Sequence, residues 1–232
     1  DDIPAEMSKQ IGERVTLVNE QIIYGAIKAS TNQYYGGTGT SIATVNGAIT
    51  LGMVRKIVKN LQANHAEPIN SVLSSSENFD TSAVPEGFSV YCNTDMEPDI
   101  RDLPNFTPAE KYASGKPMPY ELGMCERFRF IMSPDLPSLQ DAGAAVGATG
   151  LYSTTGTSID VYQFIVAADN AWSQIAVRGR QALETTDLAP GKKDKADPLG
   201  QRGYAGTAWW KAVMVENPGW CAIGNVGVRT LT

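Results

Sequence analysis

His65 is the one histidine among the 232 residues, so any serine–histidine or cysteine–histidine catalytic scheme would have to use it. It lies in the stretch NHAEP, where the amphipathic segment that precedes it is expected to end. An imidazolium at the C-terminus of a helix interacts favourably with the helix dipole. A helix-terminal role therefore accounts for His65, and a catalytic role is the alternative.

Three acidic residues, Asp95, Glu97 and Asp99, alternate in the stretch DMEPD as they do at the start of a calcium-binding loop. The rest of that pattern is missing, because its sixth position is Ile100 rather than glycine and its twelfth is Phe106 rather than glutamate. Acidic residues in the first turn of a helix are stabilising without a metal. We therefore predict the start of a helix here, with no metal and no cofactor.

The stretch GGTGTS, residues 36–41, has the glycine content of a phosphate-binding loop. It lacks the lysine of that motif, and it follows a predicted helix rather than a strand. We interpret it as a flexible connector.

Lys192 and Lys193, with Lys195 in the stretch PGKKDKAD, form a basic cluster. Two aspartates lie among these lysines and the chain has a formal net charge of −6, which is unfavourable for binding nucleic acid. The cluster is expected to be a solvated loop, with a contact at the rim of a neighbouring subunit as the functional alternative.

The three cysteines, Cys92, Cys125 and Cys221, are odd in number and widely spaced, and no pair has the spacing of zinc ligands. This pattern disfavours a disulfide framework and indicates a reducing compartment. Their simplest role is that of small, buried apolar side chains.

The sequence contains no apolar run near the ~20 residues that a membrane-spanning helix requires. The N-terminal stretch DDIPAEMSKQ is acidic and polar, unlike a secretory signal. We therefore expect no membrane partner. Because no catalytic constellation is found either, we expect the chain to act by forming a surface rather than by catalysing a reaction.

Two helices are predicted from apolar residues spaced three and four apart. The first runs from Pro4 to Ser30 and is ~40 Å long at 1.5 Å per residue. Its apolar stripe comprises Met7, Ile11, Val15, Val18, Ile22, Ala26 and Ala29. The second helix begins after the capping residue Thr50 and ends near NHAEP.

Strands are predicted at FSVYCN (88–93) and ERFRFIMSP (126–134), where apolar residues alternate with others, and at the hydrophobic segment DVYQFIVAA (160–168). Residues 94–103 are expected to form a short helix with an acidic start, and residues 138–158 to be rich in loops. The segments GTAWWKAVMV and WCAIGNVGV, joined by the turn ENPG, predict a β-hairpin. This order of elements predicts a mixed α+β architecture.

Trp209 and Trp210 are adjacent in one of these predicted strands. Neighbouring residues of a strand point to opposite faces, so one core cannot bury both. One of the two side chains must meet a second layer of this chain or another chain.

The stretch KADPLGQRGYAGTAWWKAVMVENPGWCAIGNVGV, residues 195–228, resembles the end of the major capsid proteins of one family of tailed podophages and their prophages. In that family a D-P-L-x-Q-R motif precedes a strand with an aromatic-Lys-Ala step, and a final strand follows. The matching residues here are Asp197, Pro198, Leu199, Gln201, Arg202, Trp210, Lys211, Ala212 and Trp220. Residues 49–69, 91–103, 121–134 and 160–172 resemble further blocks of the family in the same order.

The resemblance implies the Hong Kong 97 (HK97-like) capsid fold, with a long spine helix, a peripheral-domain sheet and an axial domain. It implies three regions: residues 1–45 (spine helix and loop of the peripheral domain), 46–190 (mainly axial domain) and 191–232 (C-terminal hairpin returning to the peripheral domain). The N-terminal arm and extended loop of the family are expected to be absent. Trp209, Trp210, Lys192 and Lys193 are the candidate subunit contacts, with one tryptophan under the spine helix and the other facing a neighbouring subunit or the axial domain.

The implied function is that of a structural capsid subunit without enzymatic activity. It would form hexamers and pentamers around double-stranded DNA, which it encloses without sequence-specific binding. Scaffolding and portal proteins are the further partners implied, in a virion assembled in the bacterial cytoplasm. The alternatives are an encapsulin-like compartment shell, a prophage remnant and, least favoured, an unrecognised enzyme.

Overall fold

The computed structural model describes residues 3–69, 84–112, 117–147, 149–176, 184–188, 190–193, 195 and 197–231. The chain divides into two compact units. Unit 1 comprises Asp1–Gly25 and Gln174–Met214, and unit 2 comprises Ala26–Ser173 and Val215–Thr232. Each unit is therefore built from segments that lie far apart in the sequence.

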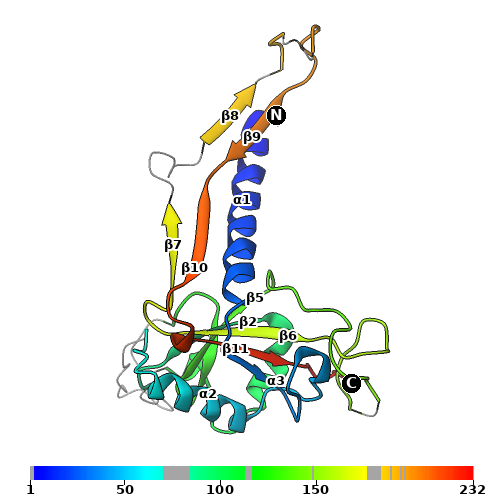
Figure 1. The fold of residues 1–232 in the computed structure, drawn as a ribbon. Helices are drawn as coiled ribbons and strands as arrows, with labels where there is room; N and C mark the ends of the chain where they lie inside the picture. Colours follow the sequence, from blue (N-terminus) through cyan, green and yellow to red (C-terminus); the bar gives the residue numbers. More distant parts are fainter. Residues whose placement is uncertain are drawn as a thin grey trace. The chain divides into compact units, whose positions relative to one another are not determined.

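A seven-stranded mixed sheet forms the centre of unit 2 (Figure 1). Its strand order is β1-β11-β6-β2-β5-β4-β3. The pairs β1–β11 and β2–β5 are parallel, and the other neighbours are antiparallel. The strands are β1 (Gln33–Tyr35), β2 (Phe88–Asn93), β3 (Thr107–Pro108), β4 (Glu121–Cys125), β5 (Phe128–Ser133), β6 (Tyr162–Ala167) and β11 (Cys221–Val226).

Helix α2 (Leu51–Ala63) supplies much of the core that covers this sheet. Thr50 caps it by accepting a hydrogen bond from the backbone N–H of Met53 at 3.3 Å. Its buried residues belong to one hydrophobic core cluster together with buried side chains of β2 and β5, among them Val90 and Phe130. The strands β6 and β11 are buried along their whole length, as expected for strands in the interior of a sheet.

The remaining short elements of unit 2 follow the predicted order. A 3-10 turn (Thr94–Met96) leads into α3 (Glu97–Arg101), which confirms the short helix with an acidic start. Apart from residue 148, the segment 138–158 is described and contains only isolated bridges, which confirms the predicted loop. Further 3-10 turns lie at Ile42–Thr44, Ala109–Lys111 and Pro218–Trp220.

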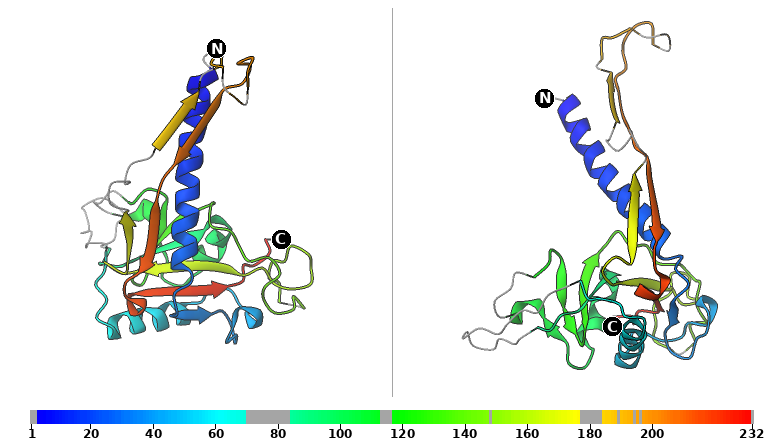
Figure 2. Two further views of the ribbon diagram at one scale, coloured as in Figure 1. Left: turned by 45° about the horizontal axis from the view of Figure 1, so that its top comes forward. Right: turned by 60° about the vertical axis from the view of Figure 1, so that its left-hand side comes forward.

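Helix α1 (Ile3–Ile27) has 25 residues, which is ~38 Å at 1.5 Å per residue. Figure 2 shows it as one unbroken helix from two further directions. This confirms the long helix predicted from the apolar stripe. The stripe itself is only partly covered, since Met7 and Ile22 are each 42% exposed and Ile11, Val15 and Val18 are half-buried. Among the described residues, no helix is both long enough and apolar enough to cross a bilayer.

Two two-stranded ribbons lie outside the large sheet. Strand β8 (Glu184–Leu188) pairs antiparallel with β9 (Tyr204–Ala208), and β7 (Trp172–Ala176) pairs with β10 (Lys211–Val215). Strand β8 was not predicted, because its sequence ETTDL has no apolar alternation.

The predicted C-terminal hairpin is wrong. Strand β10 pairs with β7, whereas β11 enters the large sheet between β1 and β6. The turn between them, Pro218–Trp220, is capped by Asn217, whose side chain accepts from the N–H of Gly219 at 2.9 Å. The bounds of the two units also differ from the ranges 1–45, 46–190 and 191–232, because each of the three ranges contributes to both units.

Candidate functional site

His65 lies at the end of α2 and is exposed to solvent. It follows the C-cap residue Asn64 and has a φ of +56°, the left-handed conformation that commonly ends a helix. Its backbone N–H donates to the carbonyl of Gln62 at 3.0 Å. The structure therefore shows His65 at the end of a helix. It is exposed to solvent, whereas a catalytic role would require a polar pocket around it.

The three acidic residues of the DMEPD stretch have separate partners. Asp95 accepts a hydrogen bond from the Tyr162 hydroxyl at 3.0 Å, and Glu97 pairs with Arg101 at 2.8 Å. Asp99 is buried and accepts from the backbone N–H of Arg229 at 3.0 Å. These contacts are structural. In the part of the chain that the structure describes, no three histidine, cysteine or acidic side chains gather as metal ligands.

The glycine-rich segment 36–41 is a closely packed loop rather than the flexible connector that was predicted. A side chain at Gly36 would collide with the carbonyl of Gly47, and Gly37 has a φ of +72°. The N–H of Thr38 donates to the Asn46 side chain at 2.9 Å. The glycines therefore permit close contact between two backbone segments, and that N–H is not directed at a phosphate.

The three cysteines are buried and form no disulfide, as predicted. Burial raises the pKa of the Cys221 thiol to about 12 and that of Cys125 to about 11. Burial also raises the pKa of Cys92. Because the thiolate is the reactive form, these side chains are unreactive members of the core.

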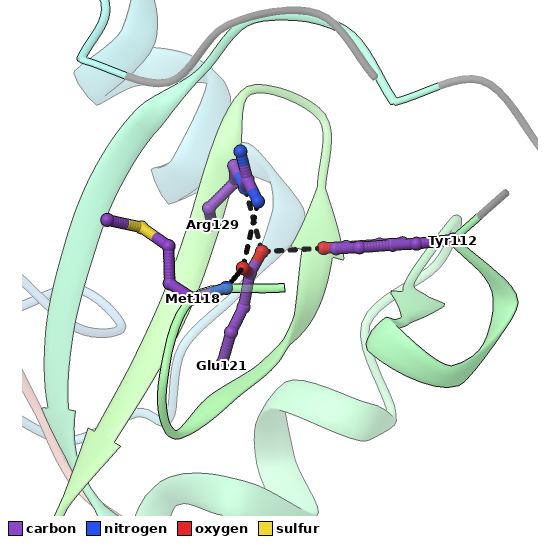
Figure 3. A network of polar contacts seen from close by, with 4 residues as sticks. All are labelled: Tyr112, Met118, Glu121 and Arg129. Atoms are coloured by element: carbon purple, nitrogen blue, oxygen red, sulfur yellow. Dashed lines mark hydrogen bonds and ion pairs between the residues drawn. The ribbon is translucent and has the colours of Figure 1, made fainter. Parts of the chain in front are cut away.

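A buried ion pair, missed by the sequence analysis, joins β4 to β5 (Figure 3). The Arg129 guanidinium donates to both carboxylate oxygens of Glu121, at 2.7 and 2.8 Å. The carboxylate also accepts from the Tyr112 hydroxyl at 2.9 Å and from the backbone N–H of Met118 at 2.7 Å. These four hydrogen bonds connect the segment before β4 to the sheet.

Neither charge of this ion pair is accessible to a ligand. The Arg129 and Glu121 side chains are 4% and 0% exposed. Burial raises the pKa of the Tyr112 hydroxyl, and its hydrogen bond to Glu121 raises it further. The network is therefore a structural device. The alternation in FRF predicted the strand, but it could not show that the arginine is buried.

Unit 2 contains an open cleft of about 840 Å³ beside α3 and the segment 228–231. Its lining includes Asp95, Asp160 and Arg229. Asp160 accepts from the Thr154 hydroxyl at 2.6 Å, while Arg229 pairs with Asp99 at 3.3 Å and with Asp102 at 3.1 Å. These charged groups of the cleft thus have partners within the chain.

Trp209 and Trp210 differ in their surroundings, although both lie between β9 and β10 rather than within a strand. The Trp209 indole N–H donates to the Asn19 side chain of α1 at 3.1 Å, and this side chain is half-buried. Trp210 is 56% exposed. One tryptophan thus contacts the long helix, as predicted, and the contact of the other with a neighbouring subunit stays a prediction.

Exposure alternates along residues 204–214, which lie in unit 1. The even-numbered positions are exposed: Tyr204, Gly206, Ala208, Trp210, Ala212 and Met214. These six residues, called here the apolar ribbon face, include no charged side chain. Tyr204, Trp210 and Met214 are 47%, 56% and 48% exposed, so three large side chains of this face are about half accessible to solvent.

Charged side chains of both signs are exposed in unit 1. Lys192 and Lys193 lie in the segment between β8 and β9, and Glu6, Glu13 and Glu20 lie on α1. Within the described ranges of the chain, none of these five forms an ion pair. Their charges are therefore available to a partner.

The described part of unit 1 has almost no core of its own. Of its residues whose burial the structure describes, Tyr24 and Gly200 alone are buried. Isolated helices and two-stranded ribbons are marginally stable in water. Unit 1 is therefore expected to gain stability from contacts with other groups.

The structure has a fold found in phage capsids. It matches a chain of the capsid structure of the cyanophage P-SCSP1u with a TM-score of 0.52 and 14% identity, covering 97% of this chain and 66% of that chain. A chain from Mycobacterium phage Che8 matches with a TM-score of 0.55 and 12% identity, covering 94% of this chain and 61% of that chain. The α+β class is confirmed, and it is consistent with the expected HK97-like fold.

The sequence is similar to the major capsid protein of Pseudomonas phage KPP21, with 24% identity over 204 residues. The alignment covers 82% of this chain, which spans about half (51%) of that relative. No protein-family model matches the sequence. The predicted resemblance to a phage major capsid protein is thus confirmed by both comparisons.

Proposed function

We propose that this chain is a structural subunit of an icosahedral phage or prophage capsid. It associates with copies of itself into hexamers and pentamers that enclose double-stranded DNA. The observation that carries the proposal is the similarity to a phage major capsid protein over 82% of the chain. The match to a phage capsid structure over 97% of the chain supports it independently of sequence.

The properties of unit 1 favour a protein that functions in contact with copies of itself. A long helix with a partly exposed apolar stripe, and ribbons with an uncharged exposed face, gain stability when neighbours cover them. We assign unit 1 to the peripheral domain and unit 2, with its seven-stranded sheet, to the axial domain. In this proposal unit 2 is the self-stable part of the subunit and unit 1 is the part that association stabilises.

The proposed contents and partners follow from the charge of the chain. A net charge of −6 disfavours tight, salt-dependent binding of phosphates, so the shell retains DNA by enclosing it. Scaffolding and portal proteins are the further partners we propose. The subunit would be made in the bacterial cytoplasm and would end in the virion, without catalysing a reaction.

The test is expression of the chain followed by sedimentation velocity and negative-stain electron microscopy. We expect rings or closed shells built of six- and five-fold units. A chain that stays monomeric at every concentration would contradict the proposal. Particles isolated from the natural host would distinguish the alternative, because protected double-stranded DNA indicates a capsid and a protein cargo indicates a compartment shell.

A further inference from the structure

The apolar ribbon face is directed away from the helix that belongs to the same unit. Exposure alternates from residue to residue along 204–214, as it does where adjacent residues of an extended chain point to opposite sides. Trp209 and Lys211 both approach Asn19 of α1, with donor–acceptor distances of 3.1 and 3.5 Å. Trp210, which lies between them in the sequence, therefore points away from α1, as do the other even-numbered positions.

This face has the composition of a protein-binding surface. From Tyr204 to Met214 it spans eleven residues, or ~33 Å for ten steps of about 3.3 Å. Three large side chains, Tyr204, Trp210 and Met214, are separated by glycine and alanine, so they project from an otherwise flat strip. Aromatic residues and methionine are enriched at buried interfaces, where charged residues are depleted.

The unpaired charges of unit 1 are complementary between two copies. Glu6, Glu13 and Glu20 are seven residues apart and share one side of α1, opposite the apolar stripe. Lys192 and Lys193 carry the opposite charge on a different segment of the unit. A second copy thus offers each group the partner that the described part of its own chain does not supply.

We infer that the apolar ribbon face binds unit 1 of a second copy of this chain, with Lys192 and Lys193 of one copy facing Glu13 and Glu20 of the other. The inference rests on the proposed capsid function and specifies the surface that carries it. The lysines and the acids lie on different elements, so the lysine segment of each copy can meet the acidic side of α1 of the next copy in a head-to-tail contact. Contacts of that kind close into rings when the rotation permits, as hexamers and pentamers require.

Duplex DNA fits this surface less well. An uncharged face offers phosphates no counter-charge, and three exposed glutamates on α1 repel them. If the lysines bound DNA instead, charge reversal would weaken DNA binding and leave self-association unchanged. That result would overturn the inference.

The first experiment compares Trp210→Ala with the unchanged chain in sedimentation velocity over a concentration series. A central aromatic contact predicts an apparent dissociation constant raised by roughly 30-fold. The matched control is Tyr152→Ala, which truncates an aromatic side chain of similar exposure in unit 2 (44% against 56%) and is expected to leave association unchanged. Equal association of Trp210→Ala and the unchanged chain would overturn the inference.

The second experiment exchanges the charges. Lys192→Glu with Lys193→Glu, and separately Glu13→Lys with Glu20→Lys, are each expected to weaken association about tenfold. Combining all four substitutions restores opposite charges across the contact and should recover most of the loss. The control is Lys59→Glu, an exposed lysine on α2 of unit 2. Losses that simply add in the four-fold variant would contradict the pairing.

The outcomes separate the inference from the proposed function. If the unchanged chain does not associate, the proposed function fails. If it associates and the variants do so equally, the inference alone fails. Far-ultraviolet circular dichroism of each variant shows whether it is folded, so that a loss of association is not mistaken for unfolding.

Discussion

At the scale of single residues, the stability contribution of Arg129 and of Glu121 depends on the presence of the other. Both side chains are almost completely buried, and each is compensated by the other and by neighbouring donors and acceptors. Removing one member of such a pair leaves an uncompensated charge in the interior, which is far more costly than removing both. The network therefore makes the two substitutions strongly non-additive.

We predict that Arg129→Met lowers the free energy of unfolding by ~3–5 kcal/mol, because Glu121 then stays buried without a counter-charge. Glu121→Leu combined with Arg129→Met should be less destabilising than the single change. Urea unfolding followed by circular dichroism measures both. A double variant as unstable as the sum of the two single variants would contradict the prediction.

Asp160 gives a prediction about pH. It is buried and accepts hydrogen bonds from the backbone N–H groups of Asp141 and Thr154 and from the Thr154 hydroxyl, at 2.9, 3.1 and 2.6 Å. Burial alone would raise the pKa of this carboxyl, but these hydrogen bonds favour the charged form and lower the pKa below its usual value of 3.8. The carboxylate thus adds stability above its unfolded-state pKa, and this stability is lost as the pH falls through the folded-state pKa.

Asp160→Asn should therefore destabilise the chain by roughly 1–3 kcal/mol near neutral pH. The difference from the unchanged chain should shrink as the pH is lowered below about 4. Urea unfolding at several pH values measures it. A difference that stays constant between neutral and acidic pH would show that the charge of Asp160 is not responsible.

At the scale of elements, replacing a glycine by alanine is expected to have opposite effects on stability in α1 and in β11. A side chain at Gly12 of α1 would meet no atom within 4 Å. Glycine is ~1 kcal/mol less favourable than alanine inside a helix, so Gly12→Ala should stabilise α1 by about that amount. Amide hydrogen exchange of α1 should slow accordingly, and unchanged or faster exchange would contradict the prediction.

Gly224 of β11 is expected to behave in the opposite way. It lies opposite Phe164 of β6, and a side chain there would collide with the phenylalanine ring. Gly224→Ala should cost ~1–3 kcal/mol of unfolding free energy, measured by urea unfolding, because the central strands are closely packed. Phe164→Leu in the same chain should relieve part of the collision, and no relief would contradict this explanation.

The elements that could be predicted from the sequence are those with a local signal. The spacing of apolar residues predicted α1 and α2, and alternation predicted β2 and β5. Pairing is decided by residues distant in the chain, so the sequence did not show that β11 lies between β1 and β6. The same reason explains why the ion pair of Arg129 was missed, since Glu121 comes from another strand.

The candidate site was predicted in part for the same reason. The two adjacent tryptophans identified the segment, and the absence of charge at its even-numbered positions can be seen in the sequence. The contact of Trp209 with Asn19, 190 positions away, decides which side α1 covers. That contact is visible only in the folded chain.

At the scale of the whole molecule, burial is distributed unequally between the two units. The described core cluster lies within unit 2, whereas the described part of unit 1 is mostly exposed. Local stability follows the density of buried contacts. Unit 1 should therefore open more readily than unit 2 in the free chain.

We predict that amides of β8 and β9 exchange much faster than those of β6 and β11 in the unassembled chain, and that assembly slows their exchange selectively. Hydrogen exchange of free chain and particles, read by mass spectrometry, measures this. Strand β6 is the internal control, because the sheet already protects it. Equal protection of β8 and β9 in both states would contradict the prediction.

The apolar ribbon face also has a consequence for the time before assembly. Newly synthesised copies display it before any neighbour has arrived, and such patches adhere indiscriminately in a crowded cell. Charged groups act at longer range than apolar contact, so the lysines and glutamates of unit 1 would orient two copies before their strips touch. Correct assembly would then compete with aggregation, and the rate of the electrostatically steered encounter would decide between them. Added salt screens the charges and would therefore shift the balance towards aggregates.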